Sequence, residues 1–282
     1  MSNKVAVVSG GTAGIGAAVV ERLRGAGYSV VTGSRSAVPE KSDDLTVVRA
    51  DLGTGQGVEA LAMAALERGR VDAVVNNVGR FDHRASFLDI TDEQWQESFA
   101  VNVLSAVRLT RALLPALLEQ GGAIVNVSSI NARLPFPNVV DYSAYKAALT
   151  NLTTSLSEEF APRGVRVNAV SPGPVRTSSL SAVATASGIT RDRTLDEGVP
   201  AKMGVTLDRV GEAHEVAEAV AFFLSPQAQW ITGSDLVVDG GTIKTVCPVQ
   251  PTGPGPGPVG RRSGGWTVRR LRPFWVYSGA TL

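Results

Sequence analysis

A glycine-rich segment near the start of the chain separates a short apolar run from a stretch with helical periodicity. Residues 5–9 are apolar, residues 9–16 carry four glycines, and residues 14–25 have the helical pattern. A strand, a tight glycine turn and a helix place backbone N–H groups and a positive helix end where they bind a pyrophosphate. The segment therefore predicts a dinucleotide-binding loop; the plainer alternative is a flexible turn without a ligand. The residues expected at the phosphates are Gly10, Thr12, Gly14, Ile15 and Gly16.

The same alternation of apolar runs and helical stretches continues along the chain. The runs expected to form strands are residues 5–9, 28–32, 45–49, 71–76, 123–128, 165–171 and 236–239. The stretches expected to form helices are residues 14–25, 58–68, 91–118, 141–161 and about 212–224. Short apolar strands separated by helices indicate a parallel sheet covered on both faces. We therefore expect an α/β fold, a single doubly wound Rossmann domain over residues 1–246 with a seven-stranded parallel sheet and helices on both faces.

Two regions interrupt this alternation. Residues 177–210 are mixed in composition and are expected to be a substrate-loop insertion over the sheet edge, within which the charged residues 191–197 are expected to form a mobile lid. Residues 247–282 are rich in proline, glycine and arginine and lack apolar periodicity. Such a composition cannot bury enough surface to fold alone, so we expect a disordered tail there.

The composition restricts the environment and the partners. The net charge is +1, and because the residues after 243 contain bases but no acid, the rest of the chain is mildly acidic and no nucleic-acid partner is expected. Cys247 is the single cysteine, and His83 and His214 lack metal-ligand spacing, so we expect neither a disulfide nor a metal site. The chain has no apolar run of about 20 residues and no signal-peptide pattern at its start. We therefore expect a cytoplasmic protein without a membrane partner.

The residues after the second predicted strand indicate which dinucleotide binds. An acid there would accept hydrogen bonds from the ribose hydroxyls and repel a 2′-phosphate, but the chain has Gly33, Ser34 and Arg35. The guanidinium of Arg35 can pair with a phosphate, which favours NADP(H) over NAD(H). The alternative is a solvated loop arginine with weak selectivity. Asp51 and Leu52 follow the third strand and are expected at the adenine, although a surface turn also explains Asp51.

Tyr142 and Lys146 are four residues apart in a predicted helix and therefore share one of its faces. Tyrosine exchanges a proton near neutral pH only if its pKa of about 10 is lowered, which an adjacent ammonium does by favouring the phenolate. Ser129 ends the preceding strand, where its hydroxyl can hold a substrate oxygen. Asn102 is polar among valines and leucine, and a buried amide there can bind a water that links Lys146 to solvent. This set suits hydride transfer at a carbonyl, where a proton is exchanged at the oxygen.

Neighbouring residues of the same types compete for these roles. Tyr145 is adjacent to the lysine and should point to a different face of the helix. Ser128 should face the opposite side of the strand from Ser129. Ser143 is interpreted as a helix-surface residue.

Seven segments, in this order over residues 4 to about 246, resemble the short-chain dehydrogenase/reductase family. They are residues 9–16, 76–79 (Asn-Asn-Val-Gly), 101–103 (Val-Asn-Val), 127–129 (Val-Ser-Ser), 142–146 (Tyr-Ser-Ala-Tyr-Lys), 168–177 and 238–241 (Val-Asp-Gly-Gly). Val78 departs from the family, which usually has alanine there, and the chain extends past the family's usual end. The resemblance implies that Asn102, Ser129, Tyr142 and Lys146 form the family's catalytic tetrad. The cofactor contacts that it implies are Asn77, Val78, Gly79, Tyr142, Lys146, Pro172, Gly173, Val175 and Thr177.

The function implied by the resemblance is that of an oxidoreductase. It would transfer a hydride between NADP(H) and a small-molecule carbonyl or secondary alcohol, with Tyr142 as general acid/base and ketone reduction as the expected direction. Two alternatives remain at this point: an NAD-dependent alcohol dehydrogenase of the same family, and a non-catalytic NADP-sensing binding protein. Substrate contacts are expected from residues 80–88, 130–141 and 177–210. A homo-oligomer, either a dimer or a tetramer, is expected because two long helices often form the subunit interface in this family.

Overall fold

The computed structural model describes residues 4–178, 180–181 and 194–244. By its internal contacts the chain divides into two units, Met1–Ile243 and Lys244–Leu282. All the elements given below belong to the first unit. The predicted tail at residues 247–282 and residues 191–193 of the predicted lid lie outside the described residues.

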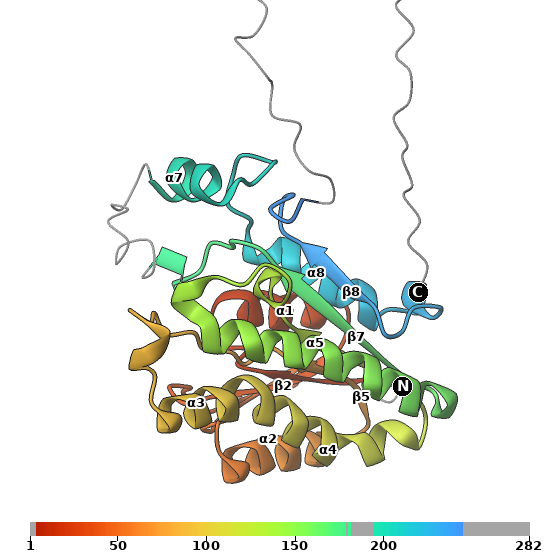
Figure 1. The fold of residues 1–282 in the computed structure, drawn as a ribbon. Helices are drawn as coiled ribbons and strands as arrows, with labels where there is room; N and C mark the ends of the chain where they lie inside the picture. The colour runs from red at the N-terminus through yellow and green to blue at the C-terminus, as the bar shows by residue number, and fades with distance from the viewer. Residues whose placement is uncertain (1–3, 179, 182–193, 245–282) are drawn as a thin grey trace, which may run out of the picture. The chain divides into compact units, whose positions relative to one another are not determined.

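A largely parallel sheet forms the centre of the first unit (Figure 1). Its order, within the described residues, is β3-β4-β2-β1-β5-β6-β7-β8, and every neighbouring pair is parallel except β3 and β4. The strands are β1 (Val5–Ser9), β2 (Ser29–Ser34), β3 (Glu40–Lys41), β4 (Leu45–Arg49), β5 (Val71–Asn76), β6 (Gly122–Val127), β7 (Val165–Pro172) and β8 (Asp235–Val238). The predicted α/β class and the seven parallel strands are confirmed. The strand count was one too low, because β3 consists of two exposed charged residues and carries no apolar pattern.

Successive residues of each strand point to opposite faces of the sheet, and different helices cover the two faces. In β1, Ala6 and Val8 pack in one core with α1 and α8, whereas Val5 and Val7 pack in the other with α2, α4 and α5. These helices are α1 (Gly14–Gly25), α8 (Ala213–Leu224), α2 (Gly55–Arg68), α4 (Ser105–Leu118) and α5 (Val140–Phe160). These four residues are fully buried, which is why residues 5–8 of β1 are apolar at every position rather than at alternate ones.

The remaining helical elements are shorter. They are η1 (Phe87–Asp89), α3 (Asp92–Phe99), η2 (Ala100–Leu104), η3 (Ile130–Ala132), η4 (Pro137–Val139), η5 (Ala161–Arg163), α7 (Thr194–Met203) and η6 (Pro226–Ala228). α7 lies within the predicted insertion, so residues 194–197 of the predicted lid begin a helix.

The helix predicted over residues 91–118 is continuous in space but not regular. α3 passes into η2, a π-helical turn that carries Asn102, and then into α4. Among the described helices, Asp92–Leu118 alone is long and apolar enough, by length and composition, to cross a membrane. Its residues Leu109, Leu113 and Leu117 are at most 1% exposed and pack against the sheet. Burial in this core therefore accounts for the apolar composition.

The order of the strands places a crevice at their carboxyl ends. β1 lies between β2 and β5, and the connections after β1 and β5 lead to helices on opposite faces of the sheet. In doubly wound sheets the ligand crevice opens at such a switch point. The glycine loop after β1 and residues 77–79 after β5 both lie at this place.

A chain of buried side-chain amides and hydroxyls crosses the core between β5 and β6. Asn76 Nδ2 donates to Thr110 Oγ1 at 3.0 Å and to Asn126 Oδ1 at 2.8 Å, and Asn126 Nδ2 donates to Thr153 Oγ1 at 2.8 Å. The four residues are 5% exposed or less. These hydrogen bonds therefore link β5 and β6 to α4 and α5 in a part of the core where water does not compete for them.

We expect Asn126→Ala to lower the free energy of unfolding by about 1–3 kcal/mol, because a buried amide hydrogen of Asn76 loses its acceptor and Thr153 Oγ1 loses one of its two hydrogen bonds. Urea unfolding followed by circular dichroism measures this. Ser155→Ala, at an exposed serine of α5, is the matched control and should change stability by less than about 0.5 kcal/mol. Equal effects of the two substitutions would contradict the expectation.

Candidate active site

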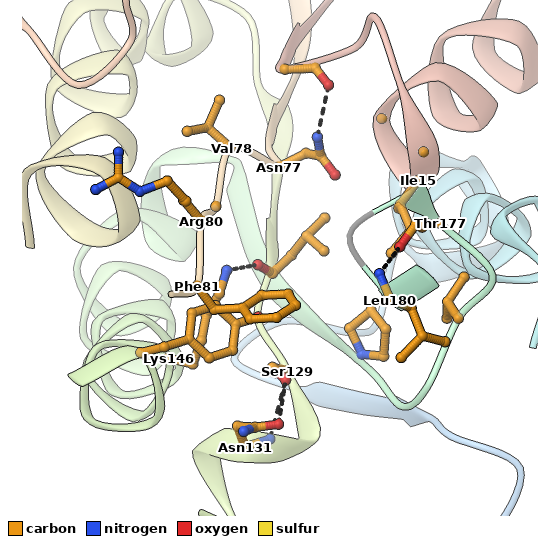
Figure 2. Close-up of a pocket in the computed structure, with 18 of the residues that line it drawn as sticks. Ile15, Asn77, Val78, Arg80, Phe81, Ser129, Asn131, Lys146, Thr177 and Leu180 are labelled. Carbon is orange, nitrogen blue, oxygen red and sulfur yellow. Dashed lines mark hydrogen bonds between the residues drawn. The ribbon is translucent and has the colours of Figure 1, made fainter. Parts of the chain in front are cut away.

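A pocket of about 660 Å³ occupies the crevice at the carboxyl ends of the strands (Figure 2). This volume lies within the range of small-molecule and cofactor sites. Predicted site residues that line it are Gly10, Gly14, Ile15, Gly16, Ser34, Arg35, Asp51, Leu52, Asn77, Val78, Gly79, Ser129, Tyr142, Lys146, Pro172, Gly173, Val175 and Thr177. Two predicted residues, Thr12 and Asn102, do not line it.

The glycine loop has the backbone geometry that the prediction needs. Gly10 and Gly14 have φ angles of 70° and 54°, a region that L side chains rarely adopt. A Cβ on Gly16 would collide with the carbonyl oxygen of Gly10. Ala13, the N-cap of α1, makes no side-chain capping bond, and the first turn contains no acid. The N–H groups at the start of α1 therefore face the pocket without a side-chain partner and suit a pyrophosphate.

The end of β2 borders the same pocket. Thr12 lies outside the lining, but its Oγ1 donates to Ser34 Oγ at 2.8 Å and so holds the loop to β2. Arg35 follows as an exposed side chain at the pocket. Asp51 also lines the pocket, and its Oδ1 accepts from the N–H of Gly53 at 3.0 Å. The structure thus places a cation, and no acid, directly after β2.

Asn77 joins the carboxyl ends of β1 and β5. Its Nδ2 donates to the backbone oxygens of Ser9 and Gly10 at 2.9 and 3.2 Å, and its backbone N–H donates to Ser9 Oγ at 2.9 Å. Two residues later, a Cβ on Gly79 would lie 3.2 Å from Lys146 Nζ and 3.3 Å from Asn102 Oδ1. A side chain at position 79 would therefore crowd these two groups, which would have to shift by a few tenths of an ångström.

Asn102 is fully buried and bonded to the backbone of the segment that forms the pocket wall. Its Oδ1 accepts from Arg80 N at 3.0 Å, and its Nδ2 donates to Arg80 O at 2.8 Å and to Ser98 O at 2.9 Å. Both amide hydrogens are thereby used. The Asn102 side chain therefore fixes the backbone of the segment that follows β5, and it does not line the pocket itself.

Lys146 is 2% exposed and points from α5 toward the end of β6. Its Nζ donates to Val127 O at 2.8 Å and lies 5.5 Å from the centre of the Tyr142 ring. Burial lowers the pKa of Lys146 to about 8, because the charged form loses its hydration.

The Tyr142 ring packs against that of Phe81, with 5.4 Å between the ring centres. Burial raises the pKa of Tyr142 to about 12, and the Ser129 side chain opposes this by hydrogen bonding. The sequence led us to expect the pKa to be lowered by the ammonium. The structure shows the opposite direction, because removal of water from the phenolate outweighs its neighbours.

The competing residues lie outside the pocket or are already bonded. Tyr145 Oη donates to Trp95 O at 2.9 Å, and its ring packs against Trp95 and Phe99. Ser128 Oγ donates to Lys146 O at 3.1 Å, on the α5 backbone. Ser143 is only 3% exposed, so its interpretation as a surface residue was wrong. It lies one residue after Tyr142 and faces the loop after β6, a burial that helical spacing alone did not indicate.

Sequence reasoning missed several residues near Tyr142. Phe81 and Asn131 line the pocket, and each lies inside a segment that was expected to contact substrate without being singled out. Arg84 Nη2 and Asp141 Oδ2 form a 2.9 Å ion pair with exposed fractions of 12% and 1%. This pair fixes residues 80–86 to the first turn of α5. No local sequence pattern indicates this ion pair, because Arg84 and Asp141 are 57 residues apart in the chain.

The predicted substrate segments also contribute to the lining. Phe136 and Val139 come from the loop after β6, and Leu180, Val199 and Met203 come from residues 177–210. These five side chains form an apolar part of the pocket wall. His83 lines the pocket as an exposed residue, and its Nδ1 lies 3.2 Å from Asn138 Nδ2.

Comparisons with known proteins agree with this geometry. A family model described as enoyl-(acyl carrier protein) reductase matches residues 10–242. An acetoacetyl-CoA reductase of Rhizobium meliloti (strain 1021) is 35% identical over 246 residues, which cover 85% of this chain and 98% of the relative.

Two solved structures have the same fold. One is the NADPH-bound short chain oxidoreductase of Pseudomonas aeruginosa PAO1, described as having an atypical catalytic centre. It is 31% identical with a TM-score of 0.76, over 86% of this chain and 97% of that one. The other is a 3-ketoacyl-(acyl-carrier-protein) reductase from Brucella melitensis with NADH, 32% identical with a TM-score of 0.74, over 85% and 98%.

The glycine loop lies at the switch point of the sheet, as a dinucleotide-binding fold requires. Together with matches of this length and identity, this establishes the class of the protein as an NAD(P)-dependent oxidoreductase. The chain belongs to the short-chain dehydrogenase/reductase family.

The buried ammonium of Lys146 makes stability depend on pH. Its pKa of about 8 in the folded protein lies below the ordinary value of 10.5, so burial of the charge destabilises the fold fully below pH 8. This penalty disappears as the pH rises toward 10.5. We expect wild type to gain stability relative to Lys146→Met between about pH 8 and about pH 10. Urea unfolding of both proteins across this range measures the difference, and a constant difference would contradict the burial of a charge.

Proposed function

We propose that this protein transfers a hydride between NADP(H) and a ketone or secondary alcohol, with ketone reduction as its working direction. The observation that carries the proposal is the arrangement of Tyr142, Ser129 and Lys146 at one end of the pocket whose other end is the glycine loop. A dinucleotide spans two such ends. The Tyr142 hydroxyl is protonated at neutral pH, as a proton donor to a carbonyl requires, although burial by itself makes it a weaker acid.

The residues around the pocket fit a dinucleotide along its length. The glycine loop and the start of α1 would hold the pyrophosphate, Ser34 and Arg35 the adenosine ribose, and Asp51 and Leu52 the adenine. Residues 77–79 would lie beside the middle of the cofactor. Residues 172–177 would hold the nicotinamide amide, and Lys146 would hold the hydroxyls of the nicotinamide ribose. The bound dinucleotide supplies the hydride in reduction and takes it up in oxidation.

The side chains of the chain supply the proton and the orientation. Ser129 would hold the carbonyl oxygen of the substrate against Tyr142. As the hydride reaches the carbonyl carbon, the Tyr142 hydroxyl would give its proton to the oxygen, and the resulting phenolate would be reprotonated from solvent. Lys146 would stabilise that phenolate as an ammonium, because a positive charge nearby favours the ionised form. Asn102 would support this set through the Arg80 backbone that it braces.

The phosphorylated cofactor is favoured by the residues after β2. Arg35 provides a guanidinium at the pocket, and neither Gly33 nor Ser34 carries an acid to repel a 2′-phosphate. The solved relatives include one bound to NADPH and one bound to NADH, so the preference rests on this chain's own residues. The alternative of a non-catalytic NADP sensor is disfavoured because the tyrosine, lysine and serine meet in one pocket.

The substrate is proposed to be a small carbonyl compound with an apolar portion. The printed names of two relatives are those of reductases of acetoacetyl-CoA and of a 3-ketoacyl carrier protein, which supports reduction as the direction. The apolar residues of the pocket end would hold the chain of such a ketone. A homo-oligomer and a cytoplasmic location remain predictions.

Tyr142→Phe removes the proton donor while it retains the ring that packs on Phe81. We expect turnover of a ketone panel with NADPH, followed by NADPH absorbance, to fall by about 10²–10⁴-fold, with NADPH affinity changed less than about threefold. Tyr145→Phe is the matched control and should keep turnover near wild type, because its hydroxyl bonds to Trp95 O outside the pocket. Normal turnover in Tyr142→Phe would overturn the mechanism.

Arg35→Ala removes the proposed 2′-phosphate contact. A hydrogen bond to a charged group contributes about 1.5–3 kcal/mol, so we expect NADPH affinity to fall by about 10- to 100-fold while NADH affinity changes little. Calorimetric titration of each cofactor measures both. Arg111→Ala, at an exposed arginine of α4, should affect neither. Tighter binding of NADH than NADPH by wild type would refute the preference.

A further inference from the structure

Residues 80–84 follow the turn after β5 and contribute to the pocket wall. At the first of them, Arg80, the backbone N–H and oxygen are bonded to the buried amide of Asn102, at 3.0 and 2.8 Å. The last of them, Arg84, is bonded to α5 and to the short helix η4 before it. Phe81 lies between these two ends and lines the pocket. The position of its ring therefore depends on how both ends of the segment are held.

Arg84 ends this segment with one backbone contact and one side-chain contact. Its backbone N–H donates to Asn138 O of η4 at 2.9 Å. Its Nη2 donates to Asp141 Oδ2, in the first turn of α5, also at 2.9 Å. Asp82 Oδ2 lies 3.7 Å from the same nitrogen, but Asp82 belongs to the segment itself and cannot hold it to another element. The side chain of Arg84 therefore fixes the segment to α5 through Asp141.

The burial of Asp141 makes this ion pair costly to break. The Asp141 side chain is 1% exposed, so water cannot replace a lost cation there. Its Oδ2 bonds to Arg84, and its Oδ1 has no hydrogen-bond partner among the residues that the structure describes. Removing one member of a buried pair leaves an unpaired charge in the interior. Residues 80–84 therefore cannot move away from α5 without leaving the Asp141 carboxylate unpaired.

Phe81 packs on the residue that is proposed to give the proton. Its ring centre lies 5.4 Å from that of Tyr142, and the two ring planes are tilted by 58°. Asp141 and Tyr142 are consecutive in the chain. The ion pair therefore fixes the segment to α5 immediately beside the residue that Phe81 touches.

We propose that Arg84, through its ion pair with Asp141, is a positioning residue that holds the Phe81 ring against Tyr142. The inference deepens the proposed function and rests on it, since it concerns the same site. Its consequence is that Phe81 determines specificity: its ring limits the size of the ketone substituent beside the reacting oxygen. Without the ion pair, the Phe81 ring leaves Tyr142 and the pocket admits a larger substituent there.

The ring contact can be measured directly, with neither cofactor nor substrate. The full chain, with carbon-labelled phenylalanine and tyrosine rings, is studied by NMR at neutral pH for the nuclear Overhauser effect between Phe81 and Tyr142. The chain has eight phenylalanines and four tyrosines, so Phe81→Leu and Tyr142→Phe assign the signals. Phe99 and Tyr145 serve as the internal reference, because their ring centres are 5.3 Å apart and neither residue lines the pocket.

In wild type both ring pairs should give the effect. Arg84→Met should lose the effect between Phe81 and Tyr142 and keep that of the reference pair. Asp141→Asn should weaken it, because a neutral hydrogen bond to Arg84 is weaker than a charge-assisted one. This second variant leaves no unpaired carboxylate in the interior and guards against misfolding of the first. Arg84→Lys keeps a cation beside Asp141 and should retain more of the effect than Arg84→Met.

Arg133→Met is the matched control. Arg133 Nη2 lies 3.0 Å from Oδ2 of Asp235, another buried aspartate, but this ion pair joins the loop after β6 to β8 and holds no part of residues 80–84. Both ring pairs should keep their effect in this variant. An unchanged effect between Phe81 and Tyr142 in both Arg84→Met and Asp141→Asn would overturn the proposal. So would its loss in Arg133→Met, which would show general loosening of the pocket.

Turnover with NADPH tests the consequence for the substrate. Symmetrical ketones carry the same substituent on both sides of the carbonyl, so diethyl and dipropyl ketone differ by one methylene on whichever side Phe81 lies. We expect the kcat/KM ratio of dipropyl to diethyl ketone to rise by about tenfold in Phe81→Ala, the effect of one methylene in an apolar pocket, and to rise also in Arg84→Met. An unchanged ratio in both variants would contradict the role of Phe81 in specificity. Absence of turnover with every ketone in wild type would refute the proposed function, and the ring contact would still decide the positioning by Arg84.

Discussion

The amide of Asn77 joins the two parts of the molecule on which the rest of the site depends. It holds the turn after β1, which forms one end of the pocket, to the segment after β5. That segment continues to Gly79 and Arg80, where Lys146 and Asn102 approach the backbone closely. The cofactor end and the chemical end of the pocket are therefore parts of one hydrogen-bonded framework. A shift of either strand end would move both.

Burial has opposite effects on the two titratable groups at the chemical end. It raises the pKa of Tyr142 and lowers that of Lys146, because each loses the hydration of its charged form. In the free protein the tyrosine is therefore neutral near pH 7, and the lysine ammonium loses its proton more readily than it would in water. In the proposed reaction, negative charge appears on Tyr142 only after it gives up its proton. At that moment an ammonium at Lys146 has a partner in a poorly hydrated site, where attraction between charges is strong.

Much of the fold could be predicted from the sequence because its signals are local and repeated. The seven parallel strands are apolar runs, and both faces of the sheet are buried, so the pattern in β1 is continuous. The π-helical turn at Asn102 was missed because helical periodicity does not register one extra residue in a turn. The partners of Arg84 and of Phe81 were missed for a different reason: they depend on how segments far apart or in different elements meet in space. The pKa of Tyr142 was predicted in the wrong direction, since a sequence shows which charges are near but not how much water is absent.

The two-residue strand β3 has a consequence for the behaviour of the protein in solution. It pairs with β4 in the antiparallel sense at one edge of the sheet, and both of its residues, Glu40 and Lys41, are charged and exposed. An unpaired edge strand is a template on which another chain can add a strand. Here the long parallel ladder ends in a short, charged one that offers few backbone groups and no apolar side chain. Growth of the sheet from one molecule to the next is therefore disfavoured at the β3 edge.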